Sequence, residues 1–167
     1  MKFELIKVEE TQKSVLRQML ELYEYEFSEF NENDINEYGF YGYRYFDHYW
    51  TDPERHAFFI KINGKYAGFV MVNNFCYVLK EKARSLAEFF VMRKYRRLGI
   101  GRSVASKIFD MFPGKWEVLQ HGRNDLSKLF WNNVIENYTN NEYMVRTVIT
   151  EEWKGQALIF NNTNKPR

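Results

Sequence analysis

The sequence predicts a single α+β domain over residues 1–167, in which a central, mostly antiparallel and twisted sheet of about seven strands carries about four helices on its faces. Two observations predict this fold. Segments with strand-like and helix-like apolar spacing follow one another in mixed order, with no repeat and no long linker between them. The chain is 167 residues long and 45% hydrophobic, which is enough for one folded core and too apolar for a disordered chain.

The N-terminal half is expected to contain a strand, a long helix, a loop region and a hairpin. Thr11 is the expected N-cap of the long helix, because a hydroxyl there can accept a bond from a free helical amide. Asn63-Gly64 is the strongest hairpin signal in the chain. The expected elements are a strand over 3–8, a helix over 11–30, a loop with a short helix over 31–50, and strands over 56–62 and 65–73.

The C-terminal half is expected to alternate strands and helices before it closes as a hairpin. Pro113-Gly114 ends the first of these helices, since proline and glycine interrupt helical hydrogen bonding. The second helix is predicted to turn five side chains inward: Leu126, Leu129, Phe130, Trp131 and Val134. The expected elements are strands over 84–92 and 115–120, helices over 100–112 and 124–136, and hairpin strands over 143–150 and 155–161.

Composition argues against several function classes. The formal net charge of +2 is too small to predict nucleic-acid binding. With Cys76 as the only cysteine, no intrachain disulfide or zinc-finger site can form, which fits a reducing compartment. The N-terminal residues lack the apolar core of a signal peptide, and no apolar run approaches the length of a membrane span. We therefore expect a cytoplasmic protein with no metal site and with no membrane or nucleic-acid partner.

The strand expected over 84–92 leads into a basic turn that contains Gly99 and Gly101, and the turn leads into a helix. Free backbone N–H groups and the positive end of the helix dipole converge at such a place. Glycine lacks a Cβ, so the backbone can adopt unusual dihedral angles and approach a phosphate closely. Five cationic side chains surround the turn: Arg93, Lys94, Arg96, Arg97 and Arg102. The segment therefore predicts a site for a ligand that carries phosphate groups.

Other glycine-containing motifs fit this turn less well. A dinucleotide-binding fingerprint needs a third glycine at position 104, where the chain has Val104. A P-loop needs a glycine earlier in the motif and a Ser or Thr after the lysine, and neither Gly64-Lys65 nor Gly114-Lys115 has them. Ser103 imitates the nucleophile of a hydrolase elbow, but Asp110, its partner in chain order, would share the same helix.

Arg96-Arg97-Leu98-Gly99-Ile100-Gly101, preceded by Phe89-Phe90-Val91, resembles the acyl-CoA signature of the GNAT superfamily of N-acetyltransferases. The order of elements also resembles this family over most of the chain, although a proline frequent in the family before the turn is absent. The resemblance implies acetyl-CoA as cosubstrate, with its pyrophosphate on the turn amides and its pantetheine arm on the backbone of the preceding strand. It further implies that the strands over 84–92 and 115–120 splay apart. The implied cofactor-binding residues are Phe89, Phe90, Val91, Arg96, Arg97, Leu98, Gly99, Ile100, Gly101, Arg102, Ser103 and Asn124.

Amide formation from a thioester needs a base, because an aliphatic amine is mostly protonated at pH 7. Glu88 and Glu117 are the predicted catalytic residues, since each lies on one of the two strands expected to splay, where several family members place a glutamate. Glu117 is slightly favoured because strand interiors rarely hold an idle glutamate. His121 is a third candidate, since an imidazole titrates in the useful range. The alternative for all three is a surface residue without a catalytic role.

The proton donor is where the chain departs from the resembled family. Asn124 and the apolar residues after it resemble a family segment whose tyrosine commonly protonates the departing thiolate, but the chain has Trp131 at that position. An indole N–H cannot supply a proton near neutral pH. Tyr138, water or unassisted departure of the thiolate remain open. Asn124 suits both the cofactor contact that the resemblance implies and an ordinary helix N-cap.

Residues 31–50 are the expected acceptor side, because their aromatic rings and carboxylates suit a cationic amine; the alternative is that the rings only pack. The predicted function is transfer of an acetyl group from acetyl-CoA to a primary amine of a small molecule or peptide. The amine would attack directly in a ternary complex, in a monomer or homodimer. The alternatives are a non-catalytic CoA-binding or regulatory module of the same fold and an anion- or nucleic-acid-binding module built on the cluster from Arg93 to Arg102.

Overall fold

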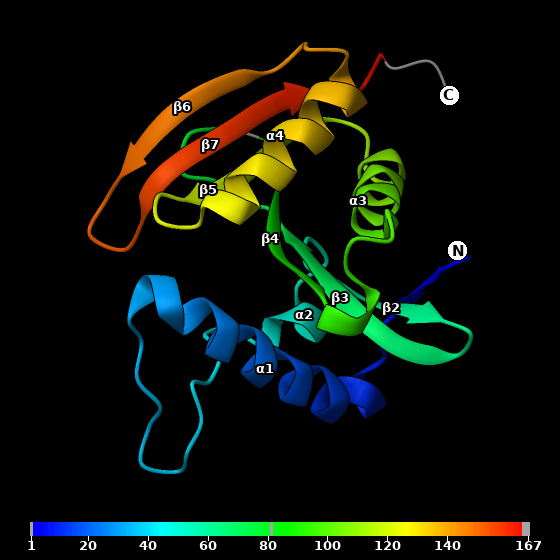
Figure 1. Ribbon diagram of the computed structural model, residues 1–167, viewed down its shortest axis with the longest axis vertical. Helices are drawn as coiled ribbons and strands as arrows, with labels where there is room; N and C mark the ends of the chain where they lie inside the picture. The colour runs from blue at the N-terminus through cyan, green and yellow to red at the C-terminus, as the bar shows by residue number, and fades with distance from the viewer. Residues whose placement is uncertain (1, 81, 165–167) are drawn as a thin grey trace.

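A computed structural model describes residues 2–80 and 82–164 as one seven-stranded sheet with helices on both faces (Figure 1). The strand order is β1-β2-β3-β4-β5-β7-β6, and every neighbouring pair is antiparallel except β4 and β5. This architecture confirms the predicted α+β fold. The elements are β1 (Glu4–Lys7), α1 (Lys13–Asn31), α2 (His48–Thr51), β2 (His56–Ile62), β3 (Lys65–Asn73), β4 (Ala83–Val91), α3 (Ile100–Met111), β5 (Lys115–His121), α4 (Asp125–Thr139), β6 (Met144–Ile149) and β7 (Lys154–Asn161).

Local sequence signals explain most of these boundaries. Asn63 and Gly64 both have positive φ, at 50° and 72°, which gives the tight turn that joins β2 to β3. The side chain of Asn124 accepts a bond from the Ser127 N–H at 3.0 Å and so caps α4. The parallel pair β4 and β5 is joined by the crossover helix α3, as such a pair requires.

The two faces of the sheet carry separate apolar cores. Helices α3 and α4 cover one face, where Phe109, Trp116 and Ile135 are buried. Helices α1 and α2 cover the other face, where Leu20 and Phe69 are buried. In Figure 1, α1 and α2 lie below the strands β2 to β4, while β5 to β7 and α4 lie above them. The strand β4 therefore connects two halves of the molecule.

Some details differ from the sequence-based expectations. Leu126 and Leu129 are 79% and 70% exposed, so their predicted inward orientation is wrong. The buried stripe of α4 begins instead at Trp131, because the helix contacts the sheet only from there onward. Thr11 lies in a turn of 3-10 helix over Glu10–Gln12, and the N-cap of α1 is Gln12 rather than Thr11. His121 ends β5 instead of following it.

None of the helices in residues 2–80 and 82–164 is both long and apolar enough to cross a bilayer. The single domain over 1–167 stays a prediction. Residues 1, 81 and 165–167, which that range includes, lie outside the described residues.

Candidate functional site

Strands β4 and β5 pair only at their N-terminal ends. Their register joins Ala83 to Lys115, Arg84 to Trp116 and Ser85 to Glu117, and no later pair joins them within the described residues. The backbone of β4 beyond Ser85 therefore has no ladder partner on its β5 side. This is the splay that the family resemblance implies, and it leaves N–H and C=O groups available to an extended ligand.

A β-bulge in β4 sets the direction of the side chains beside this splay. Met71 of β3 pairs with Glu88, while the next residue, Val72, pairs with Leu86, so Ala87 is an extra residue in β4. Leu86 accordingly packs in the core under α3 and α4, whereas Phe90 packs in the core under α1 and α2. Strict alternation would have placed these two side chains on the same face.

The turn that follows β4 delivers free amides to the start of α3. Arg97 and Gly99 have positive φ, at 61° and 75°, and this left-handed geometry reverses the chain into the helix. The backbone bonds at this end of α3 begin with the Ser103 N–H, which donates to the Gly99 carbonyl at 3.3 Å. The amides before it face outward at the positive end of the helix dipole, which is an arrangement that binds anions.

Two of the arginines near the turn are engaged by one carboxylate of α1. Arg93 Nε and Arg96 Nη2 donate to the two oxygens of Glu26 at 2.8 and 2.6 Å, and Arg96 Nε donates to the Val91 carbonyl at 2.6 Å. Burial would raise the pKa of Glu26, but the hydrogen bonds and charges of Arg96 and Arg93 outweigh it and lower that pKa. Arg93 and Arg96 thus fasten the turn to α1, and part of the local positive charge is neutralised.

Gly99 and Gly101 are glycines for different reasons. A Cβ on Gly99 would meet no atom within 4 Å, so the positive φ explains this glycine and the space above it is open. A Cβ on Gly101 would lie 3.1 Å from the ring of Phe130 in α4. Gly101 therefore allows α3 to pack closely against α4, where Arg102 Nη2 also donates to Asn133 Oδ1 at 2.6 Å.

Glu88 lies just past the bulge, on the α1 side of β4, and is half-buried. Tyr43 from the loop before α2 donates its hydroxyl to Glu88 Oε1 at 2.9 Å, and Tyr23 of α1 also bonds to this carboxylate. Burial raises the pKa of Glu88 to about 7, against the two tyrosine hydrogen bonds, which lower it. A carboxylate with this pKa is ionised in part at neutral pH and can accept a proton there.

Glu117, the other predicted catalytic residue, is fully buried and its oxygens are engaged. The carboxylate accepts from three backbone amides of the loop between β3 and β4: Tyr77 at 2.7 Å, Val78 at 3.0 Å and Leu79 at 3.0 Å. The loop in turn packs beneath β5, β6 and β7. This geometry describes an anchor for the loop, because a carboxylate that satisfies three buried amides is held as an acceptor.

His121 lies at the end of β5 among the rings of Phe27, Phe30 and Trp153, with centroid distances of 5.6, 6.3 and 5.3 Å. Its Nδ1 accepts from the Arg123 N–H at 3.3 Å. Burial and the nearby charge of Arg123 lower its pKa. His121 therefore packs between α1 and the β6–β7 hairpin as a neutral ring.

The positions considered for a proton donor are filled by core side chains. Trp131 is 6% exposed and its ring lies 5.0 Å from that of Phe89 on β4. Tyr138 lies two helical turns farther along α4, where its hydroxyl donates to Asp110 at 2.7 Å and accepts from Asn162 at 3.1 Å. Tyr138 is thus engaged at the far end of the α3–α4 interface.

The segment over 31–50 divides into packing and exposed residues. Phe46 and Tyr49 are 5% exposed and belong to the core under α1 and α2, whereas Tyr38 and Tyr45 are 76% and 53% exposed. Glu21 of α1 accepts from the Tyr41 and Gly42 amides at 2.8 and 3.0 Å, which holds this loop against the helix.

Residues that the sequence interpretation missed are all on α1: Glu21, Tyr23, Glu24 and Glu26. Tyr23 and Glu24 lie beside Glu88, while Glu21 holds the loop and Glu26 holds the arginines. Their signal in the sequence is the alternation of glutamate with tyrosine in the middle of an otherwise amphipathic helix.

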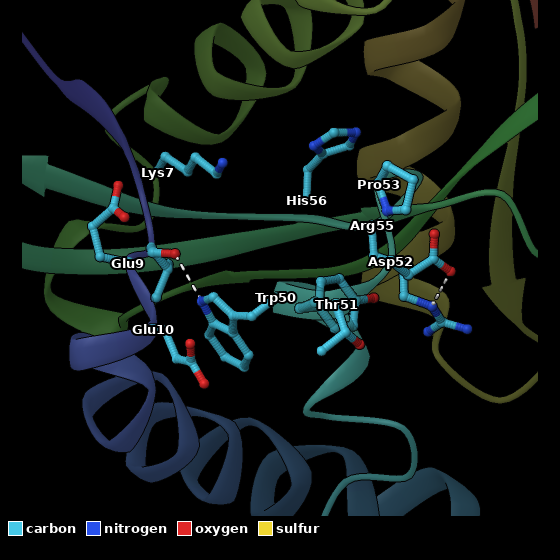
Figure 2. Close-up of a pocket in the computed structure, with 11 residues that line it drawn as sticks. Lys7, Glu9, Glu10, Trp50, Thr51, Asp52, Pro53, Arg55 and His56 are labelled. Atoms are coloured by element: carbon cyan, nitrogen blue, oxygen red, sulfur yellow. Dashed lines mark hydrogen bonds and ion pairs between the residues drawn. The ribbon is translucent and has the colours of Figure 1, made fainter.

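A separate hollow of about 460 Å³ lies at the start of β2, two strands away from β4 (Figure 2). Its polar groups partly pair with one another: Trp50 Nε1 donates to the Val8 carbonyl at 3.0 Å, and Arg55 lies 3.4 Å from Asp52. The hollow does not adjoin the turn after β4. Among residues 2–80 and 82–164, no group of three or more His, Cys, Asp or Glu side chains is arranged to hold a metal ion.

Residues 17–132 match the sequence profile of the acetyltransferase (GNAT) family, which is more than half of the chain. The chain therefore belongs to this family. It is an N-acetyltransferase, and acetyl-CoA is its cosubstrate. No curated protein sequence is significantly similar to it.

Solved structures share the fold at low sequence identity. An acetyltransferase from Thermus thermophilus has a TM-score of 0.69 and 14% identity, over 96% of this chain and 97% of that chain. The PaiA N-acetyltransferase from Thermoplasma acidophilum, in complex with coenzyme A, has a TM-score of 0.62 and 13% identity, over 96% and 99%. A spermidine N-acetyltransferase from Vibrio cholerae, in complex with CoA and spermine, has a TM-score of 0.61 and 9% identity, over 94% and 93%.

Proposed function

We propose that the protein transfers the acetyl group of acetyl-CoA to a primary amine by direct attack in a ternary complex, with Glu88 as the general base. The observation that supports this most is the position of Glu88. It lies where β4 leaves β5, its pKa is about 7, and Tyr43 fixes one of its oxygens at 2.9 Å. Such a carboxylate can take a proton from an ammonium group and leave the neutral amine that attack on a thioester requires.

Glu88 replaces Glu117 as the preferred base because their surroundings differ. Both oxygens of Glu117 are occupied by backbone amides, so proton uptake there would release the loop at 77–79. Glu88 accepts from tyrosine hydroxyls, which can remain in place when the carboxyl is protonated. His121 is a weaker candidate, because Nδ1 is used and aromatic rings surround it.

The turn after β4 suits the CoA pyrophosphate. The amides at the start of α3 can donate to phosphate oxygens, and the open space at Gly99 admits a ligand close to the backbone. No ion pair involves Lys94 or Arg97 among the described residues, so these two can supply the positive charge that Arg93 and Arg96 give to Glu26. The unpaired backbone of β4 from Leu86 to Phe90 can bind the pantetheine arm.

The reaction forms a C–N bond and breaks the C–S bond of the thioester. The amine donates its electron pair to the acetyl carbon, Glu88 holds the proton that the amine loses, and CoA leaves as a thiolate. A thiol has a pKa near 8.5, so a thiolate can depart near neutral pH and take its proton from water. With tryptophan at position 131, we assign no side chain to this protonation.

Similar structures support an amine acceptor, since they include enzymes for spermidine, for aminoglycosides and for the alanine of ribosomal protein S18. The alternative is a CoA-binding module without catalytic activity, which Trp131 favours. The cytoplasmic location and the monomeric or homodimeric state remain predictions.

Two measurements test the proposal. Thiol release from acetyl-CoA is followed with a panel of polyamines, aminoglycosides, amino acids and peptides, and CoA binding is followed by isothermal titration. We expect Glu88→Gln to retain CoA binding and to lose turnover by at least about a hundredfold, since general bases contribute about 10² to 10⁴. CoA binding without any turnover in the wild-type protein would instead support the binding module.

Gly99→Glu is the matched test of the turn. It introduces bulk and negative charge where a Cβ meets no atom within 4 Å, so the fold should tolerate it and CoA binding should be lost. Gly64→Glu is the control, because Gly64 has a similar φ of 72° and equally open surroundings in the β2–β3 turn. Normal CoA binding by a folded Gly99→Glu variant would show that the site lies elsewhere.

A further inference from the structure

Acidic residues are concentrated in one part of the chain. Residues 18–43 contain seven carboxylates and no Lys, Arg or His, although the whole chain has a formal net charge of +2. The segment comprises most of α1 and the loop that follows it, and it lies on the same side of the sheet as Glu88 (Figure 1). The seven are Glu21, Glu24, Glu26, Glu29, Glu32, Asp34 and Glu37.

Only some of these carboxylates have partners within the protein. Glu26 is paired with two arginines, Glu32 with Arg123, and Glu21 accepts from two loop amides. Within residues 2–80 and 82–164, no ion pair involves the remaining four: Glu24, Glu29, Asp34 and Glu37.

Glu24 is the member of this group that faces the proposed base. It is half-buried, and the charges of Glu88 and Glu21 both act on it. Burial, followed by the charges of Glu88 and Glu21, raises the pKa of Glu24 to about 8. Carboxylates gathered in this way without a cation are unfavourable when ionised, and a bound cation removes the repulsion.

A buried hydroxyl also lacks a partner at this place. Tyr49 is 5% exposed, and its hydroxyl oxygen has no hydrogen bond of normal geometry. Its ring lies 6.5 Å from that of Tyr43, whose hydroxyl donates to Glu88. An unsatisfied buried hydroxyl beside two carboxylates indicates that a polar ligand completes this region.

We propose that the acceptor carries a second positive charge besides the reacting amine, and that Glu24 determines this specificity by binding the second charge. The inference rests on the proposed function and narrows its substrate to aliphatic amines with at least two amino groups. The primary amine that reacts lies at Glu88, and the remaining ammonium lies between Glu24 and the tyrosines of the same segment, whose ring faces also attract cations.

The test compares two acceptors that differ in one charge. 1,4-Diaminobutane and n-butylamine present the same primary amine on a four-carbon chain, but only the first keeps an ammonium after the other nitrogen has reacted. A charged hydrogen bond in a partly buried site is worth roughly a factor of ten or more. We therefore expect kcat/KM for the diamine to exceed that for the monoamine at least about tenfold.

Glu24→Gln should remove this preference. We expect kcat/KM for 1,4-diaminobutane to fall about tenfold and that for n-butylamine to stay within about twofold, because only the diamine uses the lost charge. Glu4→Gln, at an exposed carboxylate of β1, is the control and should change neither. A linear triamine, an aminoglycoside and a lysine-containing dipeptide distinguish the sources of the shared chemistry.

Equal wild-type rates with the diamine and the monoamine, or an equal loss of both in Glu24→Gln, would overturn the inference and leave the proposed function standing. Calorimetric titration of the CoA-loaded protein with each amine separates the two ideas further. Binding of the diamine without turnover would overturn the proposed function but support recognition of the second charge. Absence of both binding and turnover with every amine would overturn both.

Discussion

Tyr43→Phe removes the hydroxyl that donates to Glu88 Oε1 at 2.9 Å and keeps the aromatic ring. The bond stabilises the ionised carboxylate, so its loss must raise the pKa of Glu88 above its value of about 7. A hydrogen bond to a charged group is worth about 1.5–3 kcal/mol, and about 1.4 kcal/mol corresponds to one pH unit. Tyr23 still bonds to the carboxylate, so we take the lower value.

The acidic limb of the pH profile of kcat/KM should therefore move upward by about one pH unit. From the ionised fractions, kcat/KM should fall roughly eightfold at pH 6.5 and hardly at all at pH 9. The assay is thiol release from acetyl-CoA between about pH 5.5 and 9.5 with one acceptor throughout, so that ionisation of the amine contributes equally to both proteins.

Tyr45→Phe is the matched control, because Tyr45 lies in the same loop and is 53% exposed. It should leave the profile unchanged. An unaltered or lowered midpoint in Tyr43→Phe would refute the reasoning, since removal of a donor to a carboxylate cannot favour its ionised form. A uniform loss at all pH values would assign Tyr43 to positioning of the loop alone.

Three further predictions concern Glu117, Glu88 and Gly101. Glu117→Gln should lower the free energy of unfolding by about 2–4 kcal/mol in denaturant titration, because it turns an amide NH₂ toward buried loop amides, and should leave the pH midpoint of any remaining activity unchanged. A shifted midpoint in a stably folded variant would return Glu117 to the base. The pKa of Glu88 in the folded protein, about 7, lies above its ordinary value of 4.5, so its contribution to stability falls as pH rises from about 4.5 to about 7. Glu88→Gln should accordingly stabilise the protein at pH 8 by about 1–3 kcal/mol, and the difference should vanish near pH 4; equal stabilisation at both pH values would contradict the raised pKa. Gly101→Ala should lower stability by about 1–2 kcal/mol because its Cβ meets the Phe130 ring at 3.1 Å, and Phe130→Leu in the same chain should recover part of the loss; an additive double variant would show that this contact is not the cause.

Much of the fold was predictable because its signals are local. The hairpin at Asn63-Gly64, the helix stop at Pro113-Gly114 and the N-cap at Asn124 each depend on a few consecutive residues. The turn around Gly99 belongs to the same class, since its positive φ and the amides after it follow from adjacent positions. Periodicity was less reliable for Leu126 and Leu129, because a helical stripe does not say where along α4 the contact with the sheet begins.

The roles of the two glutamates could not be predicted from their strands. Glu88 and Glu117 occupy neighbouring strands of similar character, and their difference comes from segments distant in sequence. The loop at 77–79 brings three amides to Glu117, whereas α1 and the loop before α2 bring tyrosine hydroxyls to Glu88. Likewise, the sequence shows a cluster of arginines but not that Glu26 binds two of them.

The sequence by itself determined the class of fold, the acyl-CoA turn and the family, because each depends on residues that are adjacent in the chain. Only the tertiary structure decided which carboxylate faces the acceptor. The extra residue Ala87 in β4 places Glu88 with Phe90 on the α1 side of the sheet, although simple alternation would have placed both with Leu86 on the other side. A bulge arises from pairing between two strands, so the residues of β4 alone do not specify it.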